Sequence, residues 1–176
     1  NNMSFQWQFG NGNTAITKDA SQTFIASLTK DSVYQVRLIG MSRYGCYDTT
    51  TKNIKVYPKP RASFTQSKND SCGPLQVTFT NTSIPYDTGS INIMTFNWSL
   101  GNGATSINTH TNTNYIASVT QDTLYSVRLI AYSEHGCADT TTSNVRIYPK
   151  PIAQFSTDVD NGCPPFAVNF SNSSTP

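Results

Sequence analysis

The chain has 176 residues, with 12 Lys and Arg against 10 Asp and Glu, and a formal net charge of +2. So small and scattered a charge argues against nucleic-acid binding, and no apolar run is long enough to span a bilayer, so we expect neither nucleic acid nor membrane insertion. Charged residues make up only 12% of the chain, whereas Ser, Thr and Asn together supply more than a third of it. With a single Glu and many Thr, Val, Tyr, Phe and Ile, the composition predicts an all-β protein.

The sequence repeats itself at a fixed spacing of 91 residues. Trp7 recurs as Trp98 (98 − 7 = 91), and residues 1–85 match residues 92–176 at 40 positions with no insertion or deletion. A fixed period of domain size predicts a tandem array of modules, which usually provides reach or multivalency rather than catalysis.

Proline-rich segments separate the modules. Tyr57-Pro58-Lys59-Pro60 recurs at 148–151, and proline can neither donate to a β-ladder nor follow a helical residue easily. We therefore expect a partial repeat over 1–58 that lacks its first strands, a complete repeat over 59–149, and the first strands of a third repeat over 150–176. Because the linker is short and stiffened by proline, we expect a semi-rigid rod.

Alternating apolar residues mark the strands of the complete repeat. In chain order they are Ala62-Ser63-Phe64, then Val77 and Phe79, then Phe96, Trp98 and Leu100 before the turn Gly101-Asn102-Gly103, then Tyr125, Val127 and Leu129, and finally Val145 and Ile147. Period-two alternation interrupted by regular turns predicts a β-sandwich. The residues before Tyr125 can form a corner in which its phenol is anchored to the backbone.

Several of these segments resemble one known domain. The run from Phe5 to Gly12, its copy from Phe96 to Gly103, and the strand that starts at Tyr125 are similar to the polycystic kidney disease (PKD) domain. The resemblance implies tandem immunoglobulin-like β-sandwich repeats with a 91-residue period. Their core signature is Trp7, Trp98, Tyr34 and Tyr125. The turn aspartate of the family is replaced by Asn11 and Asn102, so no role of that carboxylate is carried over.

Two further segments narrow the resemblance. Gly-Cys-x-Asp-Thr-Thr, which begins at Gly45 and at Gly136, and Cys-x-Pro, which begins at Cys72 and at Cys163, are similar to the PKD repeats of very large Bacteroidota surface proteins. Those proteins are exported by type IX secretion and include gliding adhesins. The resemblance implies an extracellular protein at the cell surface, attached to the outer membrane and without enzymatic activity.

That family suggests the partners as well. They are neighbouring repeats of the same chain, surface polysaccharide or the substratum, and the secretion and motility machinery of the cell envelope. The segment would then be a stiff, multivalent stalk of an adhesin filament. The alternative is a carbohydrate-binding accessory PKD module of a secreted hydrolase, which would present a line of exposed aromatic side chains.

Four cysteines, two in each period, are disulfide candidates: Cys46, Cys72, Cys137 and Cys163. One pairing joins Cys72 to Cys137 within a repeat. The other joins the loop after the first strand of one repeat to the loop before the last strand of the next. In an immunoglobulin-like topology the two loops of one repeat lie at opposite ends, whereas a disulfide needs Cα atoms within about 7 Å. Both pairings remain open, because a shift in the strand assignment would restore the first.

No cofactor is expected. Asp158 to Gly162 superficially resembles a calcium loop, but its counterpart, Ser67 to Ser71, has lost most of the ligands, and no Cys or His spacing suits zinc. There is no catalytic motif, and the pair Glu134 and His135 is interpreted as a solvated loop.

The sequence also offers candidate glycosylation sites and candidate exposed aromatic side chains. The Asp-Thr-x segments are similar to the O-glycosylation motif of Bacteroidota, with Thr49, Thr140 and Thr123 as candidate sites. Exposed strand edges explain these threonines equally well. Trp7 and Trp98 alternate with core aromatics and are interpreted as core rather than as a sugar platform. The better candidates for exposed aromatics are Tyr44, Tyr47, Tyr86 and Tyr132.

Overall fold

The computed structural model describes residues 3–86, 91–118 and 121–175. Within these ranges the regular structure is β-strand, apart from the short 3-10 helix η1 (Ile91–Ile93), and the prediction of an all-β protein is confirmed. The strands before the first proline linker are β1 (Met3–Gln8), β2 (Thr14–Ala15), β3 (Ser32–Ser42) and β4 (Tyr47–Val56). Those after it are β5 (Phe64–Gln66), β6 (Asp70–Cys72), β7 (Leu75–Asn81), β8 (Thr95–Ser99), β9 (Thr105–Ser106), β10 (Thr111–Tyr115), β11 (Thr123–Tyr132), β12 (Ala138–Tyr148), β13 (Phe155–Thr157) and β14 (Phe170–Asn172).

These strands form four sheets, ordered β2-β1-β3-β4, β10-β7-β5, β6-β12-β11-β8-β9 and β13-β14. Contacts divide the chain into two compact units. The first unit holds the residues up to Ala62 together with Ser83–Thr95 and Ala131–Thr140, and the second holds the remainder. The first proline linker and the turn between β11 and β12 therefore belong to the same unit.

Trp98 lies at the centre of a β-sandwich core in the second unit. Its fully buried ring meets the ring of Phe64 from β5 at 5.1 Å and the ring of Phe79 from β7 at 6.0 Å, measured between centroids. These contacts join the three-stranded sheet to the five-stranded sheet. Alternate residues of β11 and β12 complete the core and are fully buried: Val127, Leu129, Val145 and Ile147. The predicted alternation on these strands is confirmed, and so is the sandwich.

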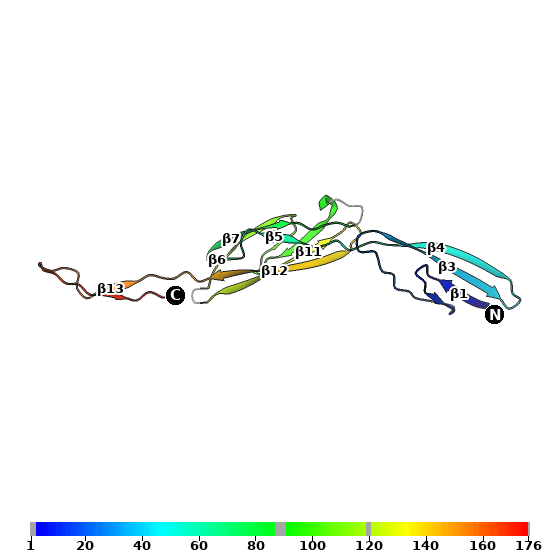
Figure 1. Ribbon diagram of the computed structural model, residues 1–176, viewed down its shortest axis with the longest axis horizontal. Helices are drawn as coiled ribbons and strands as arrows, with labels where there is room; N and C mark the ends of the chain where they lie inside the picture. The colour runs from blue at the N-terminus through cyan, green and yellow to red at the C-terminus, as the bar shows by residue number, and fades with distance from the viewer. Residues whose placement is uncertain (1–2, 87–90, 119–120, 176) are drawn as a thin grey trace. The chain divides into compact units, whose positions relative to one another are not determined.

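The strands of residues 3–56 form one sheet, in which Figure 1 shows β1, β3 and β4. Among the described residues no strand other than β1, β2, β3 and β4 pairs into this sheet. Trp7 is only half-buried, and Ile54 is 38% exposed, whereas Val145, 91 residues later, is fully buried. Trp98 is fully buried, as a core tryptophan would be, whereas Trp7 is only half-buried.

Hydrogen bonds recur at the spacing seen in the sequence. The phenol of Tyr34 donates to the carbonyl of Ile25 (2.6 Å), and that of Tyr125 donates to the carbonyl of Ile116 (2.7 Å). The bond of Tyr125 is the predicted tyrosine corner, and Tyr34 makes the same kind of bond 91 residues earlier. Likewise, the indole Nε1 groups of Trp7 and Trp98 donate to backbone carbonyls ten residues further on, at 3.2 and 2.9 Å.

The turn after β8 requires glycine for two reasons, a positive φ and a close backbone neighbour. Gly101 has a φ of +79°, and a Cβ on it would lie 2.7 Å from the carbonyl oxygen of Ser126. Gly10 has a φ of +74° and the same close approach to Gln35. The backbone of β11 thus packs directly on the turn at Gly101, and that of β3 packs on the turn at Gly10, so neither turn has room for a side chain.

In the complete repeat the strands β6, β9 and β10 escaped prediction. β10 carries mostly Thr and Asn, and its buried anchor is the single residue Tyr115. β6 occupies a segment interpreted as a loop, and it pairs in parallel with the end of β12, where Cys72 lies opposite Tyr148. That interpretation was wrong because β12 offers a free edge, and a short extended segment can satisfy its backbone groups there.

Candidate functional site

The first proline linker is held by the turn between β11 and β12. The carboxylate Oδ2 of Asp139 accepts a hydrogen bond from the backbone N–H of Ala62 (2.8 Å). The thiol Sγ of Cys137 lies 3.8 Å from the carbonyl oxygen of Tyr57, and the ring of His135 stacks on that of Tyr57 with centroids 3.6 Å apart. Pro58, Pro60 and Ala62 are themselves buried. Two side chains of this turn and one at the start of β12 therefore fix both ends of the linker.

Backbone hydrogen bonds within the turn between β11 and β12 fix its conformation. The backbone N–H of Ser133 donates to the carbonyl of Cys137 (2.9 Å), and that of Gly136 donates to the carbonyl of Ser133 (3.0 Å). Gly136 has a φ of +77°, which a residue with a side chain adopts only at a cost. The Gly-Cys-x-Asp order of this motif thereby directs the thiol and the carboxylate toward the linker.

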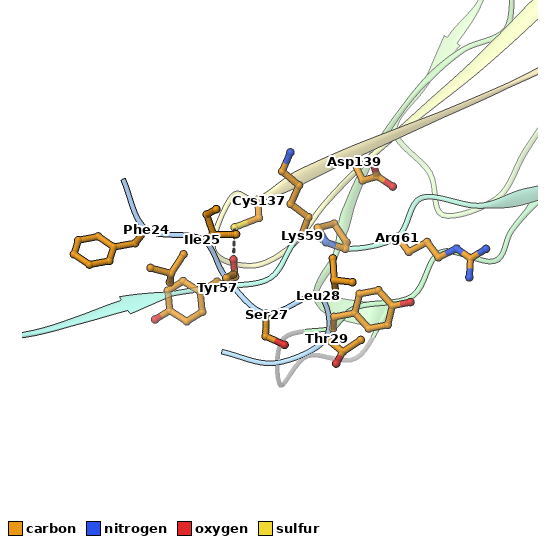
Figure 2. Close-up of a pocket in the computed structure, with 14 residues that line it drawn as sticks. Phe24, Ile25, Ser27, Leu28, Thr29, Tyr57, Lys59, Arg61, Cys137 and Asp139 are labelled. Carbon is orange, nitrogen blue, oxygen red and sulfur yellow. Dashed lines mark hydrogen bonds between the residues drawn. The ribbon is translucent and has the colours of Figure 1, made fainter. Parts of the chain in front are cut away.

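A cavity of about 700 Å³ opens beside the linker, and we call it the linker pocket. Figure 2 shows Phe24, Ile25 and Leu28 of the segment 24–29 near the linker residues Tyr57 and Lys59 and near Cys137. Ile25 and Leu28 are 78% and 87% exposed. The full lining is 24–29, Val56, Tyr57, Lys59, Pro60, Arg61, Tyr86, Cys137 and Asp139. The pocket is thus an open apolar surface with a thiol at its edge.

An ion pair lies at the end of β4. The ammonium of Lys55 lies 2.6 Å from Oδ2 of Asp31 and 4.7 Å from the centroid of the Tyr57 ring. The hydrogen bond that the ammonium of Lys55 donates to Asp31 raises the pKa of Lys55. The side chains of Lys55 and Asp31 are 47% and 22% exposed, so this ion pair adds little to the stability of the fold.

All four disulfide candidates are free thiols in this structure. Cys46, Cys72 and Cys163 are exposed, and Cys137 is half-buried. Cys137 directly precedes the 11-residue strand β12, and Cys72 pairs with the last residue of that strand. At about 3.3 Å per residue the strand is about 35 Å long, far beyond the reach of a disulfide. Pairing of Cys72 with Cys137 within one repeat does not fit this geometry.

The candidate glycosylation sites lie at strand positions. Thr49 in β4 and Thr123 at the start of β11 are half-buried, whereas Thr140 in β12 is exposed. Asp48 accepts a hydrogen bond from the N–H of Thr49, but Asp139 binds the linker instead. Sequence reasoning missed this role of Asp139. The recurrence of Asp48 and Asp139 after each Gly-Cys pair was the available signal.

The aromatic candidates do not gather into one platform. Tyr44 lies in the turn between β3 and β4 and is 76% exposed, and Tyr47, the first residue of β4, is 70% exposed. Tyr86 and Tyr132 are only half-buried rather than exposed, so their assignment as exposed aromatics was wrong. The buried ring of Trp98 cannot stack on a sugar.

The calcium-like loop uses its carboxylates internally. Asp158 accepts hydrogen bonds from the backbone N–H and the side-chain amide of Asn169 (2.9 and 2.7 Å), and these bonds lower the pKa of Asp158. Asp160 accepts a hydrogen bond from the hydroxyl of Thr157 (2.7 Å). In the described ranges no three His, Cys, Asp or Glu side chains cluster as metal ligands would. No helix there is long and apolar enough to cross a bilayer.

Comparisons with known proteins return structural likenesses. The chain is similar to the PKD1 domain of Vibrio anguillarum Epp, with 23% identity and a TM-score of 0.43 over 54% of this chain and all of that domain. It is also similar to the PKD1 domain of the Vibrio cholerae metalloprotease PrtV, with 28% identity and a TM-score of 0.40 over 51% of this chain and 98% of that one. The fibronectin(III)-like modules of Clostridium thermocellum CbhA follow at 16% identity and a TM-score of 0.38, over 84% of this chain and 77% of theirs. No family model and no curated protein matches the sequence.

Proposed function

We propose that the chain is a stalk segment of a long, secreted bacterial cell-surface adhesin, built from tandem PKD-type β-sandwich repeats with a 91-residue period. The observation that carries this proposal is the linker, since two buried prolines are fixed at one end by Cys137 and His135 and at the other by Asp139. A linker held in this way transmits orientation from one repeat to the next. The boundaries proposed for the repeats are 1–58, 59–149 and 150–176.

The proposed mechanism is mechanical. β6, near the start of the complete repeat, runs parallel to β12 at its end. The backbone N–H of Arg146 donates to Asn69 (2.8 Å), and that of Gly73 donates to Tyr148 (3.1 Å). When the two ends of the repeat are pulled apart, these hydrogen bonds are loaded together in shear rather than one at a time. Such an arrangement suits a segment under tension, and it requires neither an active site nor a cofactor.

The test measures linker stiffness directly. Spin labels at two exposed positions, Thr50 in β4 and Thr142 in β12, would report the distance across the linker by double electron–electron resonance. We expect a narrow distribution for the parent protein and a broad one for Asp139→Ala combined with Pro58→Gly and Pro60→Gly. Asp48→Ala is the matched control, since Asp48 occupies the same place in the motif without holding a linker. A broad distribution in the parent protein would contradict the stalk.

The second candidate is a carbohydrate-binding module, and the exposed pair Tyr44 and Tyr47 favours it. Retention on insoluble polysaccharides that is lost in the double variant Tyr44→Ala and Tyr47→Ala would replace the stalk as the leading function. Equal behaviour of parent and variant supports the stalk. Extracellular placement at the cell surface, anchored to the outer membrane and reached by type IX secretion, belongs to the adhesin proposal.

A further inference from the structure

Two cysteines lie beside the tyrosine that opens a proline linker, each at a different linker. Cys137, in the turn between β11 and β12, has its Sγ 3.8 Å from the carbonyl oxygen of Tyr57. Cys72, at the end of β6, pairs with Tyr148, and the next residue, Gly73, donates its N–H to the Tyr148 carbonyl (3.1 Å). Tyr57 and Tyr148 are equivalent, because each begins the sequence Tyr-Pro-Lys-Pro and they are 91 residues apart (148 − 57 = 91). The two contacts therefore describe the two sides of one kind of junction.

Cys72 shares the outer face of its ladder with Tyr148. Paired residues of neighbouring strands point to the same side of a sheet. Ser71 pairs with Ile147, which is fully buried, whereas the next pair, Cys72 and Tyr148, is exposed. The thiol of Cys72 therefore lies on the same face as the ring of Tyr148.

Cys137 approaches the equivalent tyrosine from the side of its ring. The ring of His135, two residues before Cys137, stacks on the ring of Tyr57 with centroids 3.6 Å apart. The turn thus lies against both the ring and the backbone of Tyr57. Where one complete repeat follows another, the thiols equivalent to Cys72 and Cys137 come to lie beside one tyrosine, on the side of its ring.

We propose that Cys72 of one repeat forms a disulfide with the residue equivalent to Cys137 in the repeat that follows. We call this bond the junction staple. Paired strands lie about 5 Å apart, and a disulfide needs Cα atoms within about 7 Å, so a tyrosine that both cysteines contact brings them within reach. The sequence carries one cysteine of each kind in every period, as Cys46 and Cys72 and again as Cys137 and Cys163. The inference rests on the tandem organisation proposed above.

A small-molecule disulfide such as oxidised glutathione is the oxidant. Cys72 is exposed and Cys137 half-buried, so the thiolate of Cys72 attacks first, forms a mixed disulfide and releases one molecule of reduced glutathione. The thiolate of the second cysteine then attacks the sulfur of Cys72 and displaces the other glutathione. The two cysteine sulfurs are oxidised, and their two protons leave on two molecules of reduced glutathione.

The junction staple changes which part of a repeat carries tension. A covalent route then enters a repeat at the position of Cys137, follows β12 and the linker, and leaves at the position of Cys163, the counterpart of Cys72. The strands from β7 to β11 lie outside this route. An array in this state keeps its length even when the core around Trp98 opens.

The test needs two complete repeats in succession. Because 57–60 and 148–151 have the same sequence, a second copy of residues 61–151 inserted after Pro151 continues the native linker without a foreign residue. Cys46→Ser and Cys163→Ser remove the other thiols. In the junction variant, Cys137→Ser in the first copy and Cys72→Ser in the second leave one cysteine on each side of the junction. In the matched control, both of these substitutions are in the second copy, so that Cys72 and Cys137 remain together in the first.

Both proteins are treated with oxidised glutathione at a dilution at which light scattering finds monomers. Non-reducing peptide mapping should then find Cys72 joined to Cys137 in the junction variant, with loss of both thiols. The control should show free thiols or glutathione adducts and no such link. A junction variant without the link, or equal linking in the two proteins, would overturn the proposal.

Force spectroscopy supplies an independent measurement. In the junction variant 156 residues separate the two cysteines (137 + 91 − 72 = 156). Since an extended residue spans about 3.3–3.6 Å, the oxidised chain should unfold to a length about 50 nm shorter than the reduced chain. Equal lengths would contradict the staple. A chain without the cross-link but with a narrow spin-label distance across the linker would remove the staple and leave the stalk intact.

Discussion

Phe79 and Phe170 offer a matched test of how much the sheet β10-β7-β5 adds to the stability of the β-sandwich. Phe79 is fully buried, with ring centroids 5.9 Å from Phe64 and 6.0 Å from Trp98, whereas Phe170, 91 residues later, is 70% exposed. Truncation of a buried Phe costs about 3–5 kcal/mol. We therefore expect Phe79→Ala to lose that much of the free energy of unfolding, and Phe170→Ala to change it by about 0.5 kcal/mol or less in the dilute monomer.

The assay is urea denaturation followed by the fluorescence of Trp98, in a Trp7→Phe background and reducing buffer. With a slope of about 1–3 kcal/mol per molar urea, Phe79→Ala should lower the midpoint by about 2 M. Phe170→Ala should leave the midpoint of the dilute protein unchanged. Equal losses for the two variants would refute the reasoning, because they would mean that the ring of Phe170 is packed as closely as that of Phe79.

Three further predictions follow from individual contacts. Gly101→Ala should destabilise the second unit more than Gly103→Ala, since both glycines have a positive φ but only Gly101 lies against the backbone of Ser126. Thermal unfolding compares the two variants, and equal losses of stability would contradict the close approach. Tyr125→Phe should cost about 1–2 kcal/mol, because the carbonyl of Ile116 loses its donor, and a neutral result in urea titration would remove the corner from the account. Burial raises the pKa of Tyr115 above its usual value of 10.0, so the unfolded chain releases this proton at a lower pH than the folded chain does. The free energy of unfolding should therefore hold below about pH 10 and fall as the pH rises above it, and it should fall less steeply in Tyr115→Phe. Parallel pH profiles of the two proteins would exclude this cause.

Sequence patterning could predict the strands whose apolar residues alternate, as at Val127 and Leu129. It could not predict β10, because Thr111 and Thr113 carry no apolar signal and the strand exists through its ladder with β7. β6 was missed for a related reason, since its extended form depends on the free edge of β12. Such strands are decided by partners distant in sequence rather than by their own residues.

The linker was predicted to be stiff from its prolines alone, but the residues that hold it were not found. Asp139 and Ala62 are 77 positions apart, and no local pattern connects them. Burial is equally invisible to a local reading. Trp7 and Trp98 share the same motif, yet only Trp98 is covered, because the difference comes from a hairpin and not from the strand that carries the indole.

Hydrogen exchange read residue by residue tests most directly the claim that Asp139 holds the first proline linker. In the parent protein the backbone N–H of Ala62, which donates to Oδ2 of Asp139, should exchange slowly. In Asp139→Ala this amide should exchange much faster, while the amides of β7, which pair with β10, keep their protection. An Ala62 amide that exchanges equally slowly in both proteins would contradict the account.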